Sequence, residues 1–321
     1  MFPIKARKGA NLFTKLNQIT KRLLKTYDNQ SLSTKRRLAF FFAITEPLRY
    51  IKSKLSYYNF IKSSADTIFK IDEEIGFTKI NLPDTLLKQV VESTKIIKET
   101  RSAALNDKPY LRAMSDISDY AIDSPEMTLA TNPGVLRSVQ EYLGHAPFLY
   151  DITALYSPSS SINNNGERAL YSGSQLFHRD GDDLRICKIW ILCSNVTMQN
   201  GPTTLMDANE SEQIARSIDY KQETKLSVEK ELALNIQVNR LKYAIGEVGT
   251  TYATDTVRLL HYGSRTSEEN DRLVLMLHYV SFYSCYFRRF ARRGKRKTLH
   301  TSVTSDSTNS IQKIALRGYL D

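Results

Sequence analysis

Hydrophobic and polar positions follow two different spacings in this chain, and the change falls near Gly144. Before it, residues 83–106 carry apolar side chains every three or four positions, which predicts an amphipathic helix. A second helix is predicted just before the change, because Asn132 can cap it, Pro133 suits its first turn and Gly144 suits the position just past its end. The first part of the chain is therefore expected to be helical.

After Gly144 the apolar residues come in short segments that are rich in β-branched and aromatic side chains and are separated by turn residues. This pattern is typical of antiparallel strands. We expect strands at residues 148–156, 175–180, 185–193, 203–206, 249–253, 256–260 and 273–283. A polar, helix-prone insert at residues 208–245 interrupts them. The pattern predicts a β-rich α+β fold, with an antiparallel sandwich or barrel behind N-terminal helices.

The composition is that of a soluble globular protein. The 321 residues suffice for one large domain or two modest ones, and 41% hydrophobic and 25% charged residues are ordinary values. The three cysteines form no CxxC pair, which argues against a disulfide framework and for a reducing compartment. The longest early apolar run, residues 38–44, starts too late for a signal peptide and is too short to cross a bilayer. We therefore expect a cytoplasmic protein.

The net charge of +11 is concentrated at the start of the chain. Residues 1–60 hold 13 Lys and Arg against 2 Asp and Glu, which accounts for the whole excess. A second basic run, residues 288–297, leads into a Ser/Thr-rich end that we expect to be loose. We therefore divide the chain into a basic, helical arm at residues 1–60, a central domain at residues 61–287 and a tail at residues 288–321.

The basic ends can either face water beside a neutral body or touch an anionic surface. Residues 38–55, although Pro47 interrupts them, can place apolar side chains beside basic ones, as in a helix that lies on an anionic membrane. The apolar set is Phe40, Phe41, Leu48 and Ile51, and the basic set is Arg36, Arg37, Arg49 and Lys52. The alternative is that these apolar residues pack on the central domain. Nucleic acid is not expected, because the basic runs lack interleaved aromatic residues apart from Phe287 and Phe290.

The motif HRDGDD at residues 178–183 carries the first candidate chemistry. On a strand, His178 and Asp180 would face the same way, and Gly181 would let the chain turn away after them. One imidazole and one carboxylate on one face make two thirds of the facial triad that binds Fe(II) and leaves other positions open. The motif alone is common by chance. His178 could instead be a core histidine, and Asp180 a turn residue.

Two residues further along the chain, His261 and Arg272, can complete the candidate site. His261 can supply a third, neutral imidazole ligand, although His278 is a rival because it alternates onto one strand face with Arg272. The planar guanidinium of Arg272 can hold a carboxylate through two parallel hydrogen bonds. A cosubstrate that chelates iron at one end and presents a free carboxylate at the other needs such a partner, and 2-oxoglutarate has that shape. Alternatively, Arg272 is a surface charge at the start of a strand.

HRDGDD, the following RICKIWILCSNV, then NGPTTLMDAN, and finally His261 with Arg272 resemble the phytanoyl-CoA dioxygenase-like family of Fe(II)/2-oxoglutarate-dependent oxygenases. The similarity runs in order between residues 130 and 285. It implies that the central domain is a double-stranded β-helix, a cupin-like jelly roll, with flanking N-terminal helices.

The resemblance also assigns the site. It implies that His178, Asp180 and His261 bind the iron, and that Arg272 holds the distal carboxylate of 2-oxoglutarate. The family often has a serine two residues after the last histidine. In this chain Gly263 stands there and Ser264 follows, which makes Ser264 the candidate for helping with that carboxylate.

The reaction implied is hydroxylation of an unactivated C–H bond of a small-molecule or lipid-like substrate by O₂, coupled to decarboxylation of 2-oxoglutarate to succinate. A halogenase is a rival within the same fold, but it generally lacks the carboxylate ligand, and Asp180 is present. A non-catalytic jelly roll that binds a sugar or lipid is a second alternative. The presence of all four expected site residues argues against it.

Other charged or aromatic residues near the motif have roles that the sequence assigns less specifically. Asp182 and Asp183 are expected to be solvated loop acids. Lys188 stands in an otherwise apolar strand, where an unpaired ammonium would be costly. It can pair with an acid or help bind an anionic substrate. Trp190 is expected to belong to the core.

Overall fold

The computed structural model describes residues 31–45, 66–101, 108–159, 171–281 and 298–320, together with residue 105 and isolated positions between 47 and 58. The strands are β1 (Phe77–Ile80), β2 (Arg112–Ala113), β3 (Pro147–Ser157), β4 (Ile186–Leu192), β5 (Thr204–Leu205), β6 (Lys242–Tyr243), β7 (Thr251–Thr254), β8 (His261–Tyr262) and β9 (Arg272–Ser281). They form a six-stranded sheet in the order β1-β7-β4-β9-β3-β2 and a three-stranded sheet in the order β6-β5-β8. All pairings are antiparallel.

The chain passes back and forth between these two sheets. It runs from β3 in the large sheet to residues 177–178, which bridge to Leu226 and to β8 and so extend the small sheet. It then returns to β4, crosses to β5 and β6, returns to β7, crosses to β8 and ends the barrel at β9. This alternation between two facing antiparallel sheets is the topology of a jelly roll, or double-stranded β-helix. The predicted fold class is confirmed.

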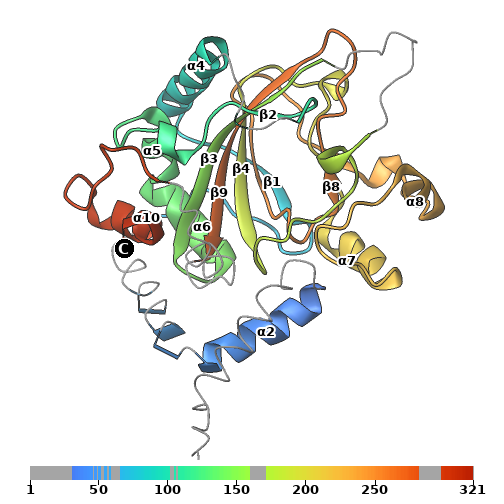
Figure 1. The fold of residues 1–321 in the computed structure, drawn as a ribbon, viewed down its shortest axis with the longest axis horizontal. Helices are drawn as coiled ribbons and strands as arrows, with labels where there is room; N and C mark the ends of the chain where they lie inside the picture. The colour runs from blue at the N-terminus through green and yellow to red at the C-terminus, as the bar shows by residue number, and fades with distance from the viewer. Residues whose placement is uncertain are drawn as a thin grey trace, which may run out of the picture.

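The helices are α2 (Leu32–Thr45), α4 (Asp84–Thr100), α5 (Pro125–Ala130), α6 (Pro133–Leu143), α7 (Ala208–Ser217), α8 (Val228–Ala233) and α10 (Ser310–Leu320). Short 3₁₀ helices lie at Ile117–Asp119, Gly173–Gln175, Met198–Asn200 and Val238–Arg240. In Figure 1, α4, α5, α6 and α10 cover one face of the large sheet, and β8 lies across its other face. The covered face supplies alternate residues to the main core, including Ile189, Ile191, Leu275 and Leu277. The other face points into the barrel, where the site lies.

Helix α6 forms as its capping residues predict. The side chain of Asn132 accepts hydrogen bonds from the backbone N–H groups of Gly134 and Val135, at 2.9 and 3.3 Å. Gly144 ends the helix in the left-handed conformation, with φ of 65°. Helix α4 was expected to reach residue 106 but ends at Thr100.

The Ser/Thr-rich end of the chain was expected to be loose, and this expectation is wrong for α10. Ala315 and Leu316 are buried in the main core. The hydroxyl of Tyr319 donates a hydrogen bond to the carbonyl of Tyr150, at 2.5 Å. The helix forms because it has an apolar face that covers β3. The basic run at residues 288–297 lies outside the described residues.

Two of the predicted strands are also different in the structure. Residues 256–260 form turns rather than a strand, because the side chain of Asp255 accepts a hydrogen bond from the backbone N–H of Val257 and so turns the chain. Of residues 175–180, only Phe177 and His178 form β-bridges with neighbouring segments. The insert at residues 208–245 carries α7 and α8, as its polar, helix-prone sequence predicted.

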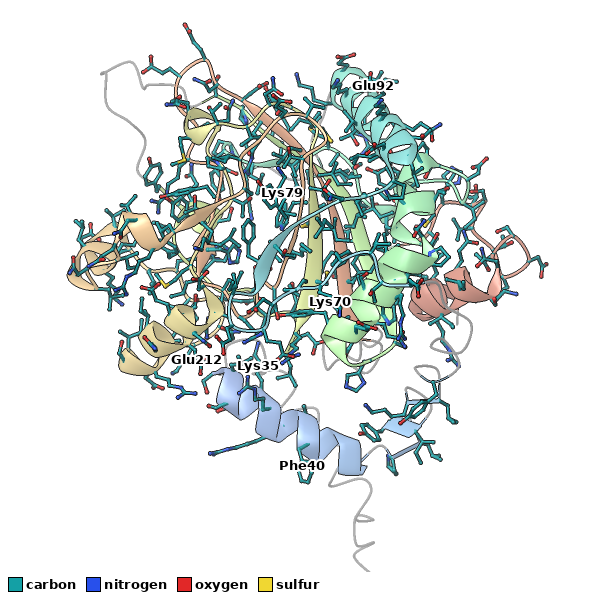
Figure 2. All side chains as sticks on the ribbon, turned by 180° about the vertical axis from the view of Figure 1, so that it is seen from behind. Lys35, Phe40, Lys70, Lys79, Glu92 and Glu212 are labelled. Carbon is teal, nitrogen blue, oxygen red and sulfur yellow. The ribbon has the colours of Figure 1, made fainter. Side chains whose placement is uncertain are left out.

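Most of the basic arm lies outside the described residues, but α2 belongs to it. Leu32 is buried at the start of α2. Lys35 is buried as well, and its ammonium donates a hydrogen bond to the carbonyl of Gly181 at 2.9 Å. Figure 2 shows Lys35 at the end of α2 that meets the barrel, with Phe40 further along the helix. No helix among the described residues is both long and apolar enough to span a membrane.

Candidate metal centre

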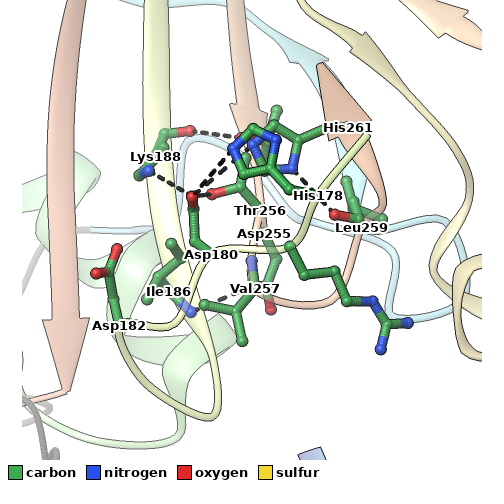
Figure 3. Close-up of polar contacts among 12 residues, drawn as sticks. His178, Asp180, Asp182, Ile186, Lys188, Asp255, Thr256, Val257, Leu259 and His261 are labelled. Carbon is green, nitrogen blue, oxygen red and sulfur yellow. Dashed lines mark hydrogen bonds and ion pairs between the residues drawn. The ribbon is translucent and has the colours of Figure 1, made fainter. Parts of the chain in front are cut away.

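The barrel brings His178, Asp180 and His261 together. One potential ligand atom from each lies within 4.8 Å of the other two. His178 Nε2 lies 3.8 Å from Asp180 Oδ1, and His261 Nε2 lies 3.9 Å from Asp180 Oδ2. The two histidines are opposite each other across an antiparallel bridge, with reciprocal backbone hydrogen bonds of 3.0 and 2.9 Å. This pairing places both rings on the same side of the small sheet, above the carboxylate (Figure 3).

Both imidazoles are held in the orientation that a metal requires. Nδ1 of His178 lies 2.8 Å from the carbonyl of Leu176, and Nδ1 of His261 lies 3.0 Å from the carbonyl of Leu259. Since a carbonyl can only accept, each Nδ1 carries the proton and each Nε2 presents a lone pair to the centre. Burial lowers the pKa of His178 well below its usual value and also lowers the pKa of His261. Both rings are therefore neutral at neutral pH, which is the ligating form.

The carboxylate of Asp180 uses its two oxygens differently. Oδ2 accepts a hydrogen bond from the ammonium of Lys188 at 2.6 Å and another from the hydroxyl of Thr256. Burial alone would raise the pKa of Asp180, but the positive charge of Lys188 and its hydrogen bond hold that pKa well below its usual value. Oδ1 is the oxygen that faces His178. Of the two roles left open for Lys188, the structure shows the pairing with an acid.

Arg272 lies on the barrel-facing side of β9 and is buried. Its guanidinium meets three hydroxyl groups, with Nη2 3.2 Å from Ser264 Oγ and 3.4 Å from Ser157 Oγ, and Nη1 3.3 Å from Thr203 Oγ1. Nε has no partner, and no carboxylate among the described residues pairs with the group. Burial lowers the pKa of Arg272 to about 10. A desolvated cation without a counter-ion is costly, so this pocket is chemically suited to an anion.

The rival histidine lies apart from this cluster. His278 Nε2 is 3.5 Å from Asp182 Oδ2, and the ring meets Tyr150 edge-on, with centroids 5.1 Å apart. The structure therefore places His261, and not His278, beside His178 and Asp180.

The expectation that Asp182 and Asp183 are solvated loop acids is wrong. Asp183 is buried, and its carboxylate accepts hydrogen bonds from the backbone N–H and the hydroxyl of Ser281, at 3.3 and 3.2 Å. Burial raises the pKa of Asp183 to about 7 and that of Asp182 to about 6. Asp183 is enclosed where its loop meets Ser281 of β9, and Lys35 of α2 binds the carbonyl of Gly181 in the same loop. Asp182 is half-buried beside His278. Trp190 belongs to the core as expected, and its indole N–H donates to the hydroxyl of Thr254 at 2.8 Å.

Three hydroxyl residues of the site were not predicted: Ser157, Thr203 and Thr256. Ser157 lies directly opposite Arg272 in the register of β3 and β9. The backbone carbonyl of Thr256 accepts a hydrogen bond from the N–H of Asp180, and the hydroxyl of Thr256 donates one to the carboxylate of Asp180. Their roles come from strand register, for which the sequence around each residue holds no local signal.

No family model matches the sequence, and no curated protein does. Among solved structures, the chain is similar to EctD from S. alaskensis in its apo form, with 13% identity, 68% of this chain and 82% of that chain covered and a TM-score of 0.47. It is also similar to HygX from Streptomyces hygroscopicus with nickel, 2-oxoglutarate and hygromycin B bound, with 16% identity, 65% and 84% covered and a TM-score of 0.44. A third is SnoN, a non-heme alpha-ketoglutarate-dependent epimerase from nogalamycin biosynthesis, with 11% identity, 65% and 78% covered and a TM-score of 0.41. Values this low assign no family, so the function is inferred from the chain's own side chains.

Proposed function

We propose that this protein is an Fe(II)/2-oxoglutarate-dependent dioxygenase of the phytanoyl-CoA dioxygenase-like type, which hydroxylates an unactivated C–H bond of a small-molecule or lipid-like substrate with O₂. The observation that carries the proposal is the combination of two features inside one jelly roll. One is the cluster of His178, Asp180 and His261. The other is the buried guanidinium of Arg272, which lacks a counter-ion among the described residues.

The donor set fits iron. Two neutral imidazoles and one carboxylate on one side of the ion leave the opposite positions open, which is the arrangement of non-haem Fe(II) oxygenases. His178 and His261 would bind through Nε2, and Asp180 through Oδ1, since Oδ2 already has two donors. O₂ would be the oxidant, bound iron would activate it, and 2-oxoglutarate would supply two of the electrons as it is decarboxylated to succinate.

The remaining residues position the cosubstrate and exclude water. Arg272 would receive the distal carboxylate of 2-oxoglutarate, with Ser264 as a hydroxyl donor beside it. Between Arg272 and His278, the barrel-facing positions of β9 are Val274 and Met276, which pack with Trp190 in an apolar cluster. An apolar wall beside the metal keeps stray water from the reacting atoms.

Two alternatives predict different behaviour. A halogenase needs an open ligand position for chloride where Asp180 stands, and the ion pair with Lys188 fixes that carboxylate in place. A non-catalytic binding protein for a sugar or lipid would not need a buried guanidinium that has no carboxylate partner among the described residues, together with three metal-ligand side chains.

The test is an anaerobic titration of the protein with Fe(II) and 2-oxoglutarate. We expect a weak visible charge-transfer band, stoichiometric iron binding, and succinate release once O₂ is admitted. His178→Ala or His261→Ala should abolish iron binding at stoichiometric Fe(II), and His278→Ala should retain it. A band that survives His261→Ala but disappears in His278→Ala would show that the third ligand is wrong, and absence of any band in the wild type would refute the function.

We also propose that the N-terminal arm contacts an anionic membrane surface peripherally. Several apolar side chains of the arm are largely exposed, namely Phe40 at 71%, Leu48 at 82%, Ile51 at 52% and Leu55 at 57%. Arg36 and Arg37 are exposed on the same helix as Phe40. Exposed apolar residues beside basic ones suit the interface of an anionic bilayer.

A further inference from the structure

The insert between β5 and β6 places a lysine directly beside the metal-ligand segment. Leu226 donates a backbone hydrogen bond to the carbonyl of Phe177 at 2.9 Å, and the two residues form an antiparallel bridge. In that register the residue opposite His178 is Lys225. Directly opposed residues project to the same face, with their Cβ atoms about 5 Å apart. Lys225 therefore extends the small sheet on the side away from β8, with its side chain on the same face as His178.

The insert holds this position firmly. The hydroxyl of Tyr220 accepts a hydrogen bond from the backbone N–H of Arg179 at 2.9 Å and donates one to the carbonyl of Thr224 at 2.6 Å. The backbone N–H of Glu223 donates to the carbonyl of Arg179 at 3.0 Å. These bonds tie the residues on either side of Lys225 to the segment between two metal ligands.

The ammonium of Lys225 is partly buried, and no acid among the described residues lies within ion-pair distance of it. Burial lowers the pKa of Lys225 to about 8, and the positive charge of Lys108 opposes its protonation further, while Asp180 and Glu223 favour it. Lys188 is already paired with Asp180, whereas Lys225 forms no ion pair among the described residues and can take a new partner.

This cation is distinct from the Arg272 pocket. The hydroxyls around Arg272 come from Thr203 and Ser264, which adjoin β5 and β8. Lys225 lies beyond residues 177–178, at the other edge of the small sheet. Lys225 therefore does not belong to the Arg272 pocket, and a cosubstrate anchored at Arg272 leaves Lys225 for a second ligand.

We propose that Lys225 binds an anionic group of the substrate next to the metal site, either a carboxylate or a phosphate. The inference rests on the proposed function, because it takes the substrate to lie on the open side of the iron. The carboxylate of Glu223 lies against Gly181 close by. Its negative charge disfavours a polyanion, so the substrate carries a single anionic group at this point.

The experiment uses full-length protein loaded anaerobically with Fe(II) and 2-oxoglutarate, so that the Arg272 pocket is filled. Inorganic phosphate and acetate are titrated separately at constant ionic strength in chloride, and binding is followed by calorimetry and by the shift of the charge-transfer band. The variants are Lys225→Gln, Lys225→Arg and, as a matched control, Lys221→Gln. Lys221 is an exposed lysine of the same insert.

We expect Lys225→Gln to weaken binding of the preferred anion by at least about fivefold, since a charge-assisted hydrogen bond is lost. Lys225→Arg should retain most of the affinity, and Lys221→Gln should match the wild type. Preference for phosphate would identify a phosphate ester, and preference for acetate a carboxylic acid. Equal affinity in wild type and Lys225→Gln, or equal weakening in Lys221→Gln, would overturn the proposal. If the band forms normally in every variant, that result leaves the oxygenase function standing, whereas a missing band in the wild type defeats the function itself.

Discussion

At the scale of single residues, the guanidinium of Arg272 is the buried cation that most clearly lacks an anionic partner among the described residues. Arg272→Ala should weaken 2-oxoglutarate binding by about 2–5 kcal/mol, the usual cost of removing one member of a buried charge pair. Iron binding should change little, because Arg272 touches none of the three ligand residues. Arg272→Lys should restore only part of the affinity, since an ammonium lacks the two-pronged geometry. Anaerobic titrations of metal and cosubstrate separate the two effects, and an unchanged 2-oxoglutarate affinity in Arg272→Ala would remove this residue from the site.

Asp183 makes a second residue-level prediction, on stability and pH. Its pKa in the folded protein is about 7, whereas an unfolded chain has about 3.9. The folded state thus holds the proton more tightly, and this contribution is present below about pH 4 and lost as the pH rises to about 7. Across that window the free energy of unfolding should fall by at most about 1.4 kcal/mol per pH unit from this group. Urea unfolding of wild type and Asp183→Asn at pH 5, 6, 7 and 8 measures it, and equal slopes for the two proteins would contradict the assignment.

At the scale of elements, the insert with α7 and α8 supports the metal-ligand segment through Tyr220. Tyr220→Phe leaves the backbone N–H of Arg179 without its partner, at a cost of about 1–3 kcal/mol for a buried group. Because Arg179 stands between His178 and Asp180, we expect both a lower free energy of unfolding and a several-fold weaker affinity for Fe(II). Tyr243→Phe is the matched control, since its hydroxyl makes only an exposed hydrogen bond of 3.3 Å to Val238. Equal metal affinity in the two variants would limit Tyr220 to a role in stability.

The elements that could be predicted from sequence are those with local signals. Asn132 and Gly144 mark the ends of α6 because capping depends on residues next to the helix. The strands β3, β4 and β9 were predicted because long apolar segments are buried whatever their partners. The short strands β6 and β8 depend on pairing with distant segments, and residues 256–260 carry the β-branched composition of a strand while Asp255 turns the chain there. Strand register decides whether such segments form strands, and register cannot be read from a single sequence.

At the scale of the whole molecule, the arm and the barrel make one prediction about membranes. Full-length protein should co-sediment with anionic vesicles at low salt, less at high salt, and not with neutral vesicles, because each Lys or Arg near such a surface contributes about 1 kcal/mol that salt screens. Phe40→Glu with Leu48→Glu should reduce this binding while 2-oxoglutarate turnover is unchanged. Phe40, Leu48 and Ile51 are exposed, whereas the side chain of Phe41 lies outside the described residues. The proposal would be refuted if the wild-type protein did not bind anionic vesicles at low salt.

The candidate site shows the same division between what a sequence displays and what it does not. His178, Asp180, His261 and Arg272 could be selected in advance, because each belongs to a residue type that the chemistry requires and the four occur in a recognisable order. The partners that orient them could not be, since Thr256, Ser157 and Thr203 are ordinary hydroxyl residues until the sheets form. The acids that follow the motif were misjudged for a related reason, because Ser281 of β9 and Lys35 of α2 approach their loop from distant parts of the chain.

The antiparallel bridge between His178 and His261 also determines when the metal-ligand cluster can form during folding. Asp180 and Thr256 are 76 positions apart, so the cluster cannot exist on a nascent chain until β8 has emerged and paired. Contacts between such distant segments form late, because the entropy of loop closure is lost before they contribute. A metal that binds only the finished cluster would leave the refolding rate unchanged and slow unfolding. Refolding and unfolding rates measured across urea, with and without Ni(II), should therefore differ only in the unfolding limb, and the bound ion would lengthen the lifetime of the folded barrel.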